Sequence, residues 1–278
     1  MKACFSAVVP LCLLFASASF TPVTMASAQE QSSQHTGPGK YLLLTDVNLK
    51  PGQGGAFQKL ESDEAQAMRA ANAPNHHIGM WAITGGSHVV YMHSFDSFAD
   101  LQKNHDATMA MSKLMDTMRT DNAAEAPLVA ERHTSIYSYE PDLSLNAHSD
   151  ISKMRFMRII IFHVRRGHDE DFKDVVKQFA KAYQSSLPEA RWAMFEKRYG
   201  IGSDNTYILC TVLASLSSVD VMRDNGKKFD AAVGADQLKT LRTGMDAAVE
   251  SSESDLFAFG PQISYVPNDW DQSFWGKK

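Results

Sequence analysis

Cysteine is scarce in this sequence. Three cysteines occur in 278 residues, and Cys4 and Cys12 both lie in the apolar stretch at the N-terminus. Cys210 is then the only thiol left for the folded part, so an internal disulfide is excluded there and a hydrophobic core must hold the fold together. No Asn-x-Ser/Thr sequon occurs either. Both absences favour a bacterial periplasm over a eukaryotic secretory route.

Short motifs of metal, nucleotide and nucleophile chemistry are also missing. The sequence contains no H-E-x-x-H, no C-x-x-C and no G-x-S-x-G. The Gly-rich turn at 52–55 lacks both the G-x-G-x-x-G spacing and the Lys-Ser/Thr of a phosphate-binding loop. His76 and His77 are adjacent, so on a strand they point to opposite faces. We predict no metal site; a site built across the sheet from His93, His105 and His133 is the alternative that their spacing allows.

The balance of charge is mildly acidic, with a formal net charge of −5 at pH 7. A concentrated basic surface is therefore not expected, which argues against nucleic acid or an anionic membrane as the partner. A small molecule is the partner that the composition leaves.

The N-terminus has the features of a secretory signal peptide. An apolar run too short to span a bilayer follows Met1-Lys2, and Ala-Ser-Ala at 26–28 is a cleavage pattern, with a second one at 16–18. We assign residues 1–28 to the signal and residues 29–39 to a flexible leader. No later segment is long and apolar enough for membrane insertion. The expected product is an exported soluble protein, in the periplasm rather than the extracellular space.

The remaining chain contains one unit twice. Hydrophobic periodicity predicts the order strand, helix, two strands, helices, strand from residue 40 to 150 and again from 151 to 267, with a C-terminal tail at 268–278. In an overlay of the two halves, Phe57 matches Phe172 and Pro74 matches Pro188. Val47 is matched to Val164, and the closing Tyr-x-Pro at Tyr139 to that at Tyr265.

This order is that of a ferredoxin-like unit, so the predicted fold class is α+β. Both helices of such a unit cover one face of an antiparallel sheet and leave the other face bare. The matching face of the second unit is the obvious cover. We therefore predict two ferredoxin-like units packed sheet to sheet as an internal pseudo-dimeric α/β barrel that encloses a core or a cavity. The chain would be a monomer with this internal pseudo-dimer, or a homodimer.

Tandem units joined in this way resemble the dimeric α/β-barrel superfamily, which includes antibiotic-biosynthesis monooxygenase-like, heme-degrading and chlorite dismutase-like proteins. The resemblance extends over residues 40–267, and its most local element is "FDSFADLQKNH" at 95–105. It implies a pocket histidine at His105 and heme as a possible cofactor. The heme-degrading pattern of an Asn on the first strand and a Trp on the third does not align here. The ligand His followed by Arg of chlorite dismutase-like proteins is also missing, so the cofactor stays unassigned.

Strand alternation supplies further candidate catalytic residues. Asp46 and His163 fall on the strand face with more ionisable groups in their respective units, and we place this face toward the cavity. The overlay treats them as equivalent, so pseudo-symmetry would bring them near a common centre, as an acid and a base for proton transfer. The alternative is that both lie solvated at strand ends.

The candidate ligand-binding residues come from the hairpin strands. Trp81 and Glu196 are equivalent in the overlay and differ in chemistry, which suggests that the halves have diverged in role; a salt-bridged surface position is the alternative for Glu196. Tyr91 and His93 share one face of the third strand. Glu64 falls where the second unit has Phe179, so either it joins a buried polar network or its helix is rotated.

Three function classes follow from these residues. The first is an exported barrel that binds a small apolar or aromatic ligand between its two sheets. The second is a monooxygenase-like or heme-linked enzyme, and the third is a structural module whose side chains fill the space between the sheets. The tail, which carries Trp270 and Trp275, is expected to lie back over the other unit or to bind a second subunit.

Overall fold

The computed structural model describes residues 37–202 and 205–276. The predicted signal peptide and the leader as far as residue 36 lie outside the described residues. The first repeat contains four strands, three helices and a short 3-10 helix: β1 (Tyr41–Leu49), α1 (Gly54–Ala71), β2 (Ile78–Ala82), β3 (His88–Phe95), α2 (Phe98–Met109), α3 (Ser112–Glu125), β4 (Val129–Tyr139) and η1 (Pro141–Leu143).

The second repeat has the same order of elements. A short 3-10 helix, η2 (Ile151–Lys153), joins the repeats. The elements of the second repeat are β5 (Phe156–Val164), α4 (Asp169–Ser186), β6 (Ala193–Tyr199), β7 (Thr206–Leu213), α5 (Ser217–Val233), α6 (Ala235–Ala248), β8 (Val249–Phe259) and η3 (Pro261–Ile263). The short helix α7 (Gln272–Trp275) follows it near the C-terminus. The predicted α+β fold with two ferredoxin-like units is confirmed.

Helix boundaries follow from local chemistry. Ser97 starts α2, and its Oγ accepts a hydrogen bond of 3.1 Å from the backbone N–H of Asp100, which satisfies one of the free donors at a helix N-terminus. Asn72 ends α1 in the left-handed region, at φ 49°, a conformation that Asn tolerates better than most residues. Pro74 follows and prevents the helix from continuing.

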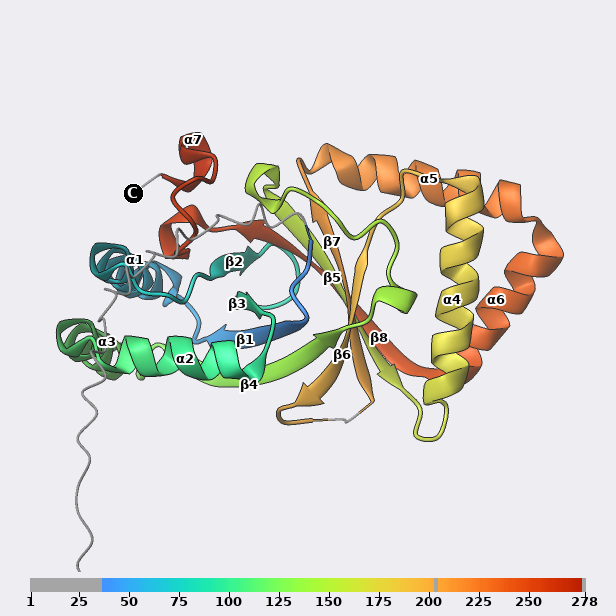
Figure 1. Ribbon diagram of the computed structural model, residues 1–278. Coiled ribbons are helices and arrows are strands. Elements are labelled where there is room, and N and C mark those ends of the chain that lie inside the picture. The colour runs from blue at the N-terminus through green and yellow to red at the C-terminus, as the bar shows by residue number, and fades with distance from the viewer. Residues whose placement is uncertain (1–36, 203–204, 277–278) are drawn as a thin grey trace, which may run out of the picture. The chain divides into compact units, whose positions relative to one another are not determined.

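The eight strands form one closed antiparallel barrel in the order β1-β3-β2-β8-β5-β7-β6-β4. The two sheets face each other and are also hydrogen-bonded at both edges, because β2 pairs with β8 and β4 pairs with β6. Figure 1 shows the helices of each repeat on the outside of that repeat's own strands. Closure leaves no open sheet edge, which removes a common route to aggregation.

Ladder register corrects two matches in the sequence overlay. Tyr41, the first residue of β1, pairs with Phe95, the last residue of β3, and Phe156, the first residue of β5, pairs with Leu213, the last residue of β7. Tyr41 therefore corresponds to Phe156. Counting along both strands from this pair matches Val47 to Phe162. Asp46 then corresponds to Ile161, and His163 to Asn48. The earlier match was wrong because it relied on two identical valines. A shift of two residues preserves the strand face, so both side chains still belong to the barrel-facing side.

The repeated Tyr-x-Pro is the second overlay error. Strand β8 ends at Phe259, so Phe259-Gly260-Pro261 corresponds to Tyr139-Glu140-Pro141, and both prolines begin a short 3-10 helix. Tyr265 lies beyond that helix, where it forms an isolated bridge with His77. It holds the segment before β2 in place and does not close the barrel.

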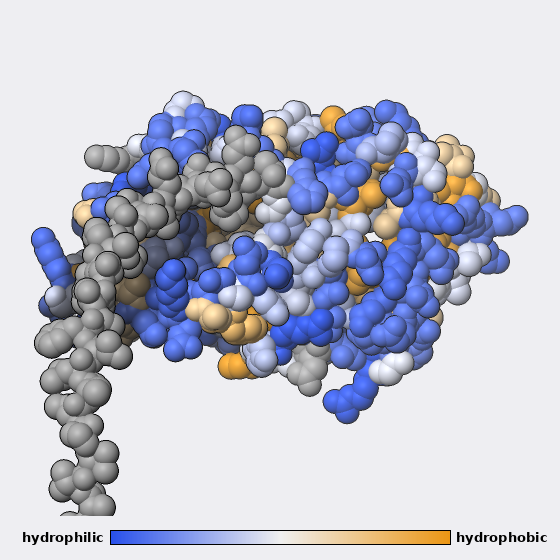
Figure 2. Space-filling view, in the orientation of Figure 1, coloured by the Kyte–Doolittle hydropathy of each residue, from blue (hydrophilic) through white to orange (hydrophobic). Residues whose placement is uncertain are grey.

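The largest hydrophobic cluster lies inside the barrel, and both repeats contribute to it. Its fully buried members include Leu42, Met80, Val90, Met157, Ile159, Phe195, Ile208 and Phe257. Separate clusters lie between each sheet and its helices. Figure 2 shows mostly hydrophilic residues on the outer surface of α4 and α6, as expected for helices that bury only one face.

The C-terminal segment packs back onto the barrel. Trp275 is 1% exposed and contacts Phe259 with ring centroids 5.5 Å apart. Its indole N–H donates a hydrogen bond of 2.7 Å to the Ser152 carbonyl. The tail therefore lies back against β8 of its own repeat and the link between the repeats, and these contacts are not with the first repeat, over which it was expected to lie. Among the described residues, no helix has the length and apolar character needed to span a membrane.

Separating the repeats should expose the barrel interior. A fragment of residues 29–150 retains β1 to β4 but loses the partners of β2 and β4 and the cover of its inner face. We expect this fragment to dimerise or aggregate, whereas the intact chain needs no second copy to close its barrel. Sedimentation velocity distinguishes these outcomes. A folded monomeric fragment would contradict the dependence of one repeat on the other.

Candidate functional site

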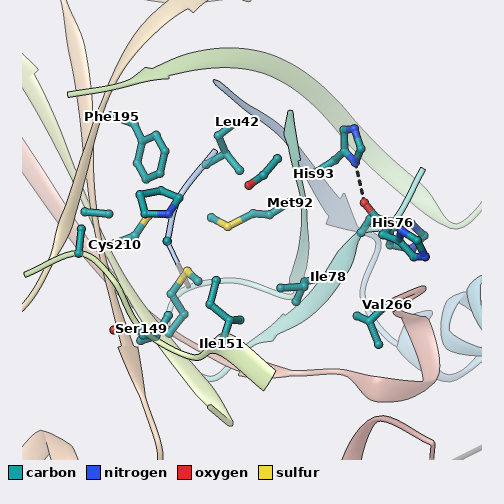
Figure 3. A pocket seen from close by; sticks show the side chains of 18 of the residues that line it. Leu42, His76, Ile78, Met92, His93, Ser149, Ile151, Phe195, Cys210 and Val266 are labelled. Atoms are coloured by element: carbon teal, nitrogen blue, oxygen red, sulfur yellow. Dashed lines mark hydrogen bonds between the residues drawn. The ribbon is translucent and has the colours of Figure 1, made fainter. Parts of the chain in front are cut away.

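A cavity of about 300 Å³ lies inside the barrel, between the two sheets. Its inner wall is apolar and comes from both repeats: Leu42, Ile78, Met92, Met157, Ala193, Phe195, Cys210 and Val212. Figure 3 shows Leu42, Met92, Phe195 and Cys210 around this space. Side chains therefore fill only part of the space between the sheets.

Two connecting segments line the rest of the cavity. Ser149 and Ile151 belong to the link between the repeats, and Val266 and Trp270 follow the last strand. The polar lining comes mainly from the segment before β2, from the end of β3 and from α2: His76, His77, His93, Ser94 and Asn104. An apolar cavity with a few polar groups is the usual character of a small-molecule site.

Cys210 is the reactive group of the inner wall. It is 7% exposed, and burial raises the pKa of its thiol to about 12. A buried thiol of this kind is not ionised at neutral pH and behaves as a small apolar side chain.

Asp46 and His163 do not line this cavity. Asp46 lies opposite His133 in the β1–β4 ladder, and burial raises the pKa of its carboxyl, opposed by His88 and His133. One carboxylate oxygen of Asp46 is buried without a hydrogen-bond partner among the described residues. His163 lies opposite Thr206 and Ser251. The titratable neighbours of Asp46 are therefore His88, His133 and Asp255, and His163 is not one of them.

A second cavity, of about 400 Å³, lies on the other face of the first repeat's sheet, under its helices. We call this space the helical chamber; its charged and polar lining comprises Glu61, Glu64, Asn75, His76, His77, Tyr91, His93, His105, Asn122, Glu125 and Arg132. Three residues that the sequence singled out, Tyr91, His93 and His105, therefore lie at one site. His105 is on the exposed side of α2.

Carboxyl groups dominate the electrostatics of the helical chamber. Burial raises the pKa of Glu61 to about 8, with Glu64 and Glu125 adding to the increase while Tyr91 opposes it. Burial and the Glu125 charge likewise raise the pKa of Glu64 to about 7. Glu125 is 5% exposed and forms an ion pair with Arg132. Three carboxyls thus share one cation, and part of the cluster holds protons at neutral pH.

The two cavities meet at the start of β2 and along β3. Met92 faces the barrel interior, while Tyr91 and His93 face the helices, because neighbouring residues on a strand alternate. His93 Nδ1 is 2.6 Å from the His76 carbonyl oxygen, a contact drawn in Figure 3. His77 lines both cavities, and burial lowers the pKa of its ring to about 4.

Trp81 and Glu196 are equivalent, as the overlay proposed: Trp81 faces Val89 and Glu196 faces Tyr207 at matching ladder positions. Neither lines the two cavities. Trp81 packs edge-on against Phe57 with ring centroids 6.2 Å apart. Glu196 is bound by Arg198 at 2.7 Å, which matches the salt-bridged alternative, and burial raises the pKa of its carboxyl.

Sequence reasoning missed Glu61 and Glu125. Both lie on helices, where a glutamate normally marks the solvent side. The available signal was the overlay: Glu61 corresponds to Val176, just as Glu64 corresponds to Phe179, and both residues of the second repeat pack in hydrophobic clusters. The buried polar network was thus the correct alternative for Glu64.

Comparison with known proteins supports the fold. No protein-family model matches the chain, and no curated protein matches it. The solved structure of an anthrone oxidase-like protein aligns with a TM-score of 0.51 and 13% identity over 79% of this chain and 91% of that chain. A candidate monooxygenase from Fusobacterium nucleatum aligns with a TM-score of 0.50 and 10% identity over 81% and 93%.

The chain has the dimeric α/β-barrel fold. Both repeats lie in one polypeptide, and the barrel closes without a second chain. At such low sequence identity the likeness concerns the fold alone, and one fold can host many chemistries.

Heme does not fit either helix–sheet space. The iron would need an axial ligand and the ring an open apolar slot. In the second repeat this space is filled by packed aromatic residues, with Tyr183 and Phe229 stacked at 3.9 Å between centroids. In the first repeat the ring would face the carboxyls of Glu61 and Glu64. The described residues also contain no group of three or more His, Cys, Asp or Glu able to hold a metal ion.

Replacing Glu61 by Gln should flatten the pH dependence of stability. The pKa of Glu61 rises on folding, so its contribution is complete below the unfolded value near 4.5 and is lost as pH rises through about 8. We expect the free energy of unfolding of the parent protein to fall across this window, and that of Glu61→Gln to fall less. Urea denaturation between pH 5 and pH 8 measures both. Asp63→Asn, an exposed site on the same helix paired with Lys59, is the control; parallel profiles for all three proteins would contradict the assignment.

Proposed function

We propose that this chain is an exported binding protein whose barrel holds a small apolar or aromatic molecule between its two sheets. The supporting observation is the cavity of about 300 Å³ with its apolar inner wall. A ligand of matching character buries apolar surface against this wall, which is the main favourable contribution to such binding. The signal-peptide pattern at residues 1–28 supports export.

The lining favours binding over chemistry. Burial keeps Cys210 on the inner wall un-ionised, and Asp46 and His163 lie away from the cavity, so the other titratable lining is His76, His77, His93 and Arg191. A cavity that performed proton transfer would place a titratable group of suitable pKa against the reacting atom. The histidines stand instead in the segment before β2 and on the helix-facing side of β3, where they fix the position of a polar substituent.

The specificity expected of this site follows from its walls. Met92 and Met157 approach from opposite sheets, and methionine adapts its shape to irregular partners. Phe195 offers an aromatic face for stacking. A flat neutral ligand of one or two rings, with a hydroxyl or carbonyl directed toward His76 or Ser94, meets these features best.

A bulky residue inside the cavity should abolish this binding. Ala193 lines the cavity, and Ala193→Phe would fill the space that a ligand needs. We expect the affinity for 2-naphthol, measured by titration calorimetry, to fall by about tenfold or more, equivalent to about 1.4 kcal/mol. Val221→Phe adds the same side chain at a position that is 58% exposed, and its affinity should match the parent protein. Equal affinity in Ala193→Phe would place the ligand elsewhere.

Cys210 provides a second, independent readout. Burial keeps its thiol protonated and inaccessible, so alkylation by iodoacetamide should be slow in the native protein and fast in urea. An apolar ligand in the cavity should slow it further, because the ligand contacts the same wall. Peptide mapping by mass spectrometry identifies Cys210 separately from Cys4 and Cys12. Rapid native alkylation, unaffected by 2-naphthol, would contradict a ligand site beside Cys210.

A further inference from the structure

The helical chamber contains buried polar atoms without partners. His93 Nε2 and Asn75 Oδ1 are inaccessible to solvent and have no hydrogen-bond partner among the described residues. Both residues line the chamber, and the Tyr91 hydroxyl beside them is directed at Glu61. Buried polar atoms are nearly always paired, so two unpaired atoms around one cavity indicate a missing partner with polar groups.

Both atoms are held in place by a hydrogen bond at the other end of the same polar group. His93 Nδ1 lies 2.6 Å from the His76 carbonyl, so Nδ1 carries the proton and Nε2 presents a lone pair. Asn75 donates a hydrogen bond of 3.1 Å from Nδ2 to Thr108 Oγ1, which leaves its amide oxygen as an acceptor. Both atoms are therefore hydrogen-bond acceptors in fixed positions, and neither has a donor among the described residues.

The second repeat is an internal control for this polarity. Ladder register and helix positions match Glu61, Glu64 and Tyr91 to Val176, Phe179 and Leu209, and Glu125 to Met245. These four residues of the second repeat all pack in hydrophobic clusters. The fold therefore does not require buried acids at these positions, and the first repeat carries them at a cost in desolvation.

The chemistry of the missing partner follows from this inventory. Acceptors outnumber donors, because the carboxyls, His93 Nε2 and Asn75 Oδ1 face mainly the Tyr91 hydroxyl and the Arg132 guanidinium, which is paired with Glu125. Once Glu61 and Glu64 lose their protons, negative charge also exceeds positive charge. The partner must therefore donate several hydrogen bonds and carry positive charge, as an ammonium group does with its three N–H donors. Apolar neighbours suit a short alkyl chain: Leu43, Met68, Leu101 and Met118.

We propose that the helical chamber binds a small primary ammonium ion, with Glu61 and Glu64 as its counter-ions and His93 Nε2 and Asn75 Oδ1 as hydrogen-bond acceptors. This site shares His76, His77, Met92 and His93 with the cavity between the sheets, but its counter-ions line the helical chamber alone, so it does not depend on the function proposed for that cavity. The ion's positive charge replaces the protons that the carboxyls otherwise hold.

Proton exchange gives this site a characteristic pH dependence. The raised pKa values of Glu61, about 8, and Glu64, about 7, mean that a bound cation must displace protons, so affinity rises with pH across this range. The other titratable or charged groups of the chamber come from every element around it: His76 and His77 before β2, Tyr91 and His93 on β3, His105 on α2, Asp121 and Glu125 on α3, and Arg132 on β4.

Calorimetric titration with n-butylammonium chloride tests the proposal. We expect saturable binding to the full chain that tightens from pH 6 to pH 8 and, in buffers of different ionisation enthalpy, releases protons. Neutral 1-butanol, of the same length, should bind at least about tenfold more weakly. Glu61→Gln and Glu64→Gln should each weaken butylammonium about tenfold, whereas Asp63→Asn on the solvent side of α1 should bind it as the parent protein does.

Several outcomes would overturn the proposal. They are no saturable binding of butylammonium, equal binding of 1-butanol, or unchanged affinity in both glutamine variants. Strict competition, in which the apparent Kd of butylammonium rises without limit as 2-naphthol is added, would place the amine between the sheets instead. Circular dichroism confirms that each variant is folded, and glutamine has nearly the size of the protonated acid that it replaces. Loss of 2-naphthol binding alone would contradict only the function proposed for the barrel.

Discussion

Hydrogen bonding between the outer strands of the two repeats is the constraint on which this structure depends. Each ferredoxin-like unit alone has two free sheet edges and one bare apolar face. Pairing of β2 with β8 and of β4 with β6 removes all four edges and brings the two bare faces together in one interior. Because both sheets line this interior, Leu42 and Met157 contact the same core, and neither repeat can change its inner face independently. The helices pack mainly on the sheet of their own repeat, with Phe98 of α2 against Tyr199 of β6 as a contact across repeats, so the two outer layers are largely free to differ.

The space between helices and sheet is apolar in the second repeat and polar in the first. In the second repeat the helices pack through Val176, Phe179 and Phe229, which gives the usual apolar core between helix and sheet. In the first repeat the matching space holds Glu61, Glu64 and Glu125. Buried acids cost free energy, and the raised pKa values of Glu61 and Glu64 express this cost as proton uptake. Since the second repeat shows that an apolar solution exists in the same chain, the polar chamber is a departure that the fold itself did not require.

The fold could be predicted from the sequence because it depends on periodicity, which one chain displays directly. Alternation along β1 correctly placed Asp46 toward the barrel, and helical spacing placed Glu64 at an inward position. The chamber could not be predicted in the same way, because Glu61, Tyr91 and Glu125 come from three separate elements and only the packing of α1 and α3 over β3 joins them. The pairing of Asp46 with His163 failed for a related reason. It relied on identical valines, whereas register is determined by the hydrogen bonds of β1 with β3 and β4, which residue identity does not reveal.

Strand β3 is where the inner and outer layers meet. Met92 lines the interior cavity, and its neighbour His93 points into the helical chamber, because side chains alternate across a strand. The His93 ring is held by the carbonyl of His76, which also belongs to the lining of both cavities. A molecule in the interior cavity that moves His76 therefore also moves the carbonyl that orients the His93 ring, and with it the position of His93 Nε2 in the helical chamber. Coupling between two binding sites is reciprocal by thermodynamic necessity, so a cation that fixes His93 in the chamber would hold the His76 segment and act on affinity in the interior by the same factor.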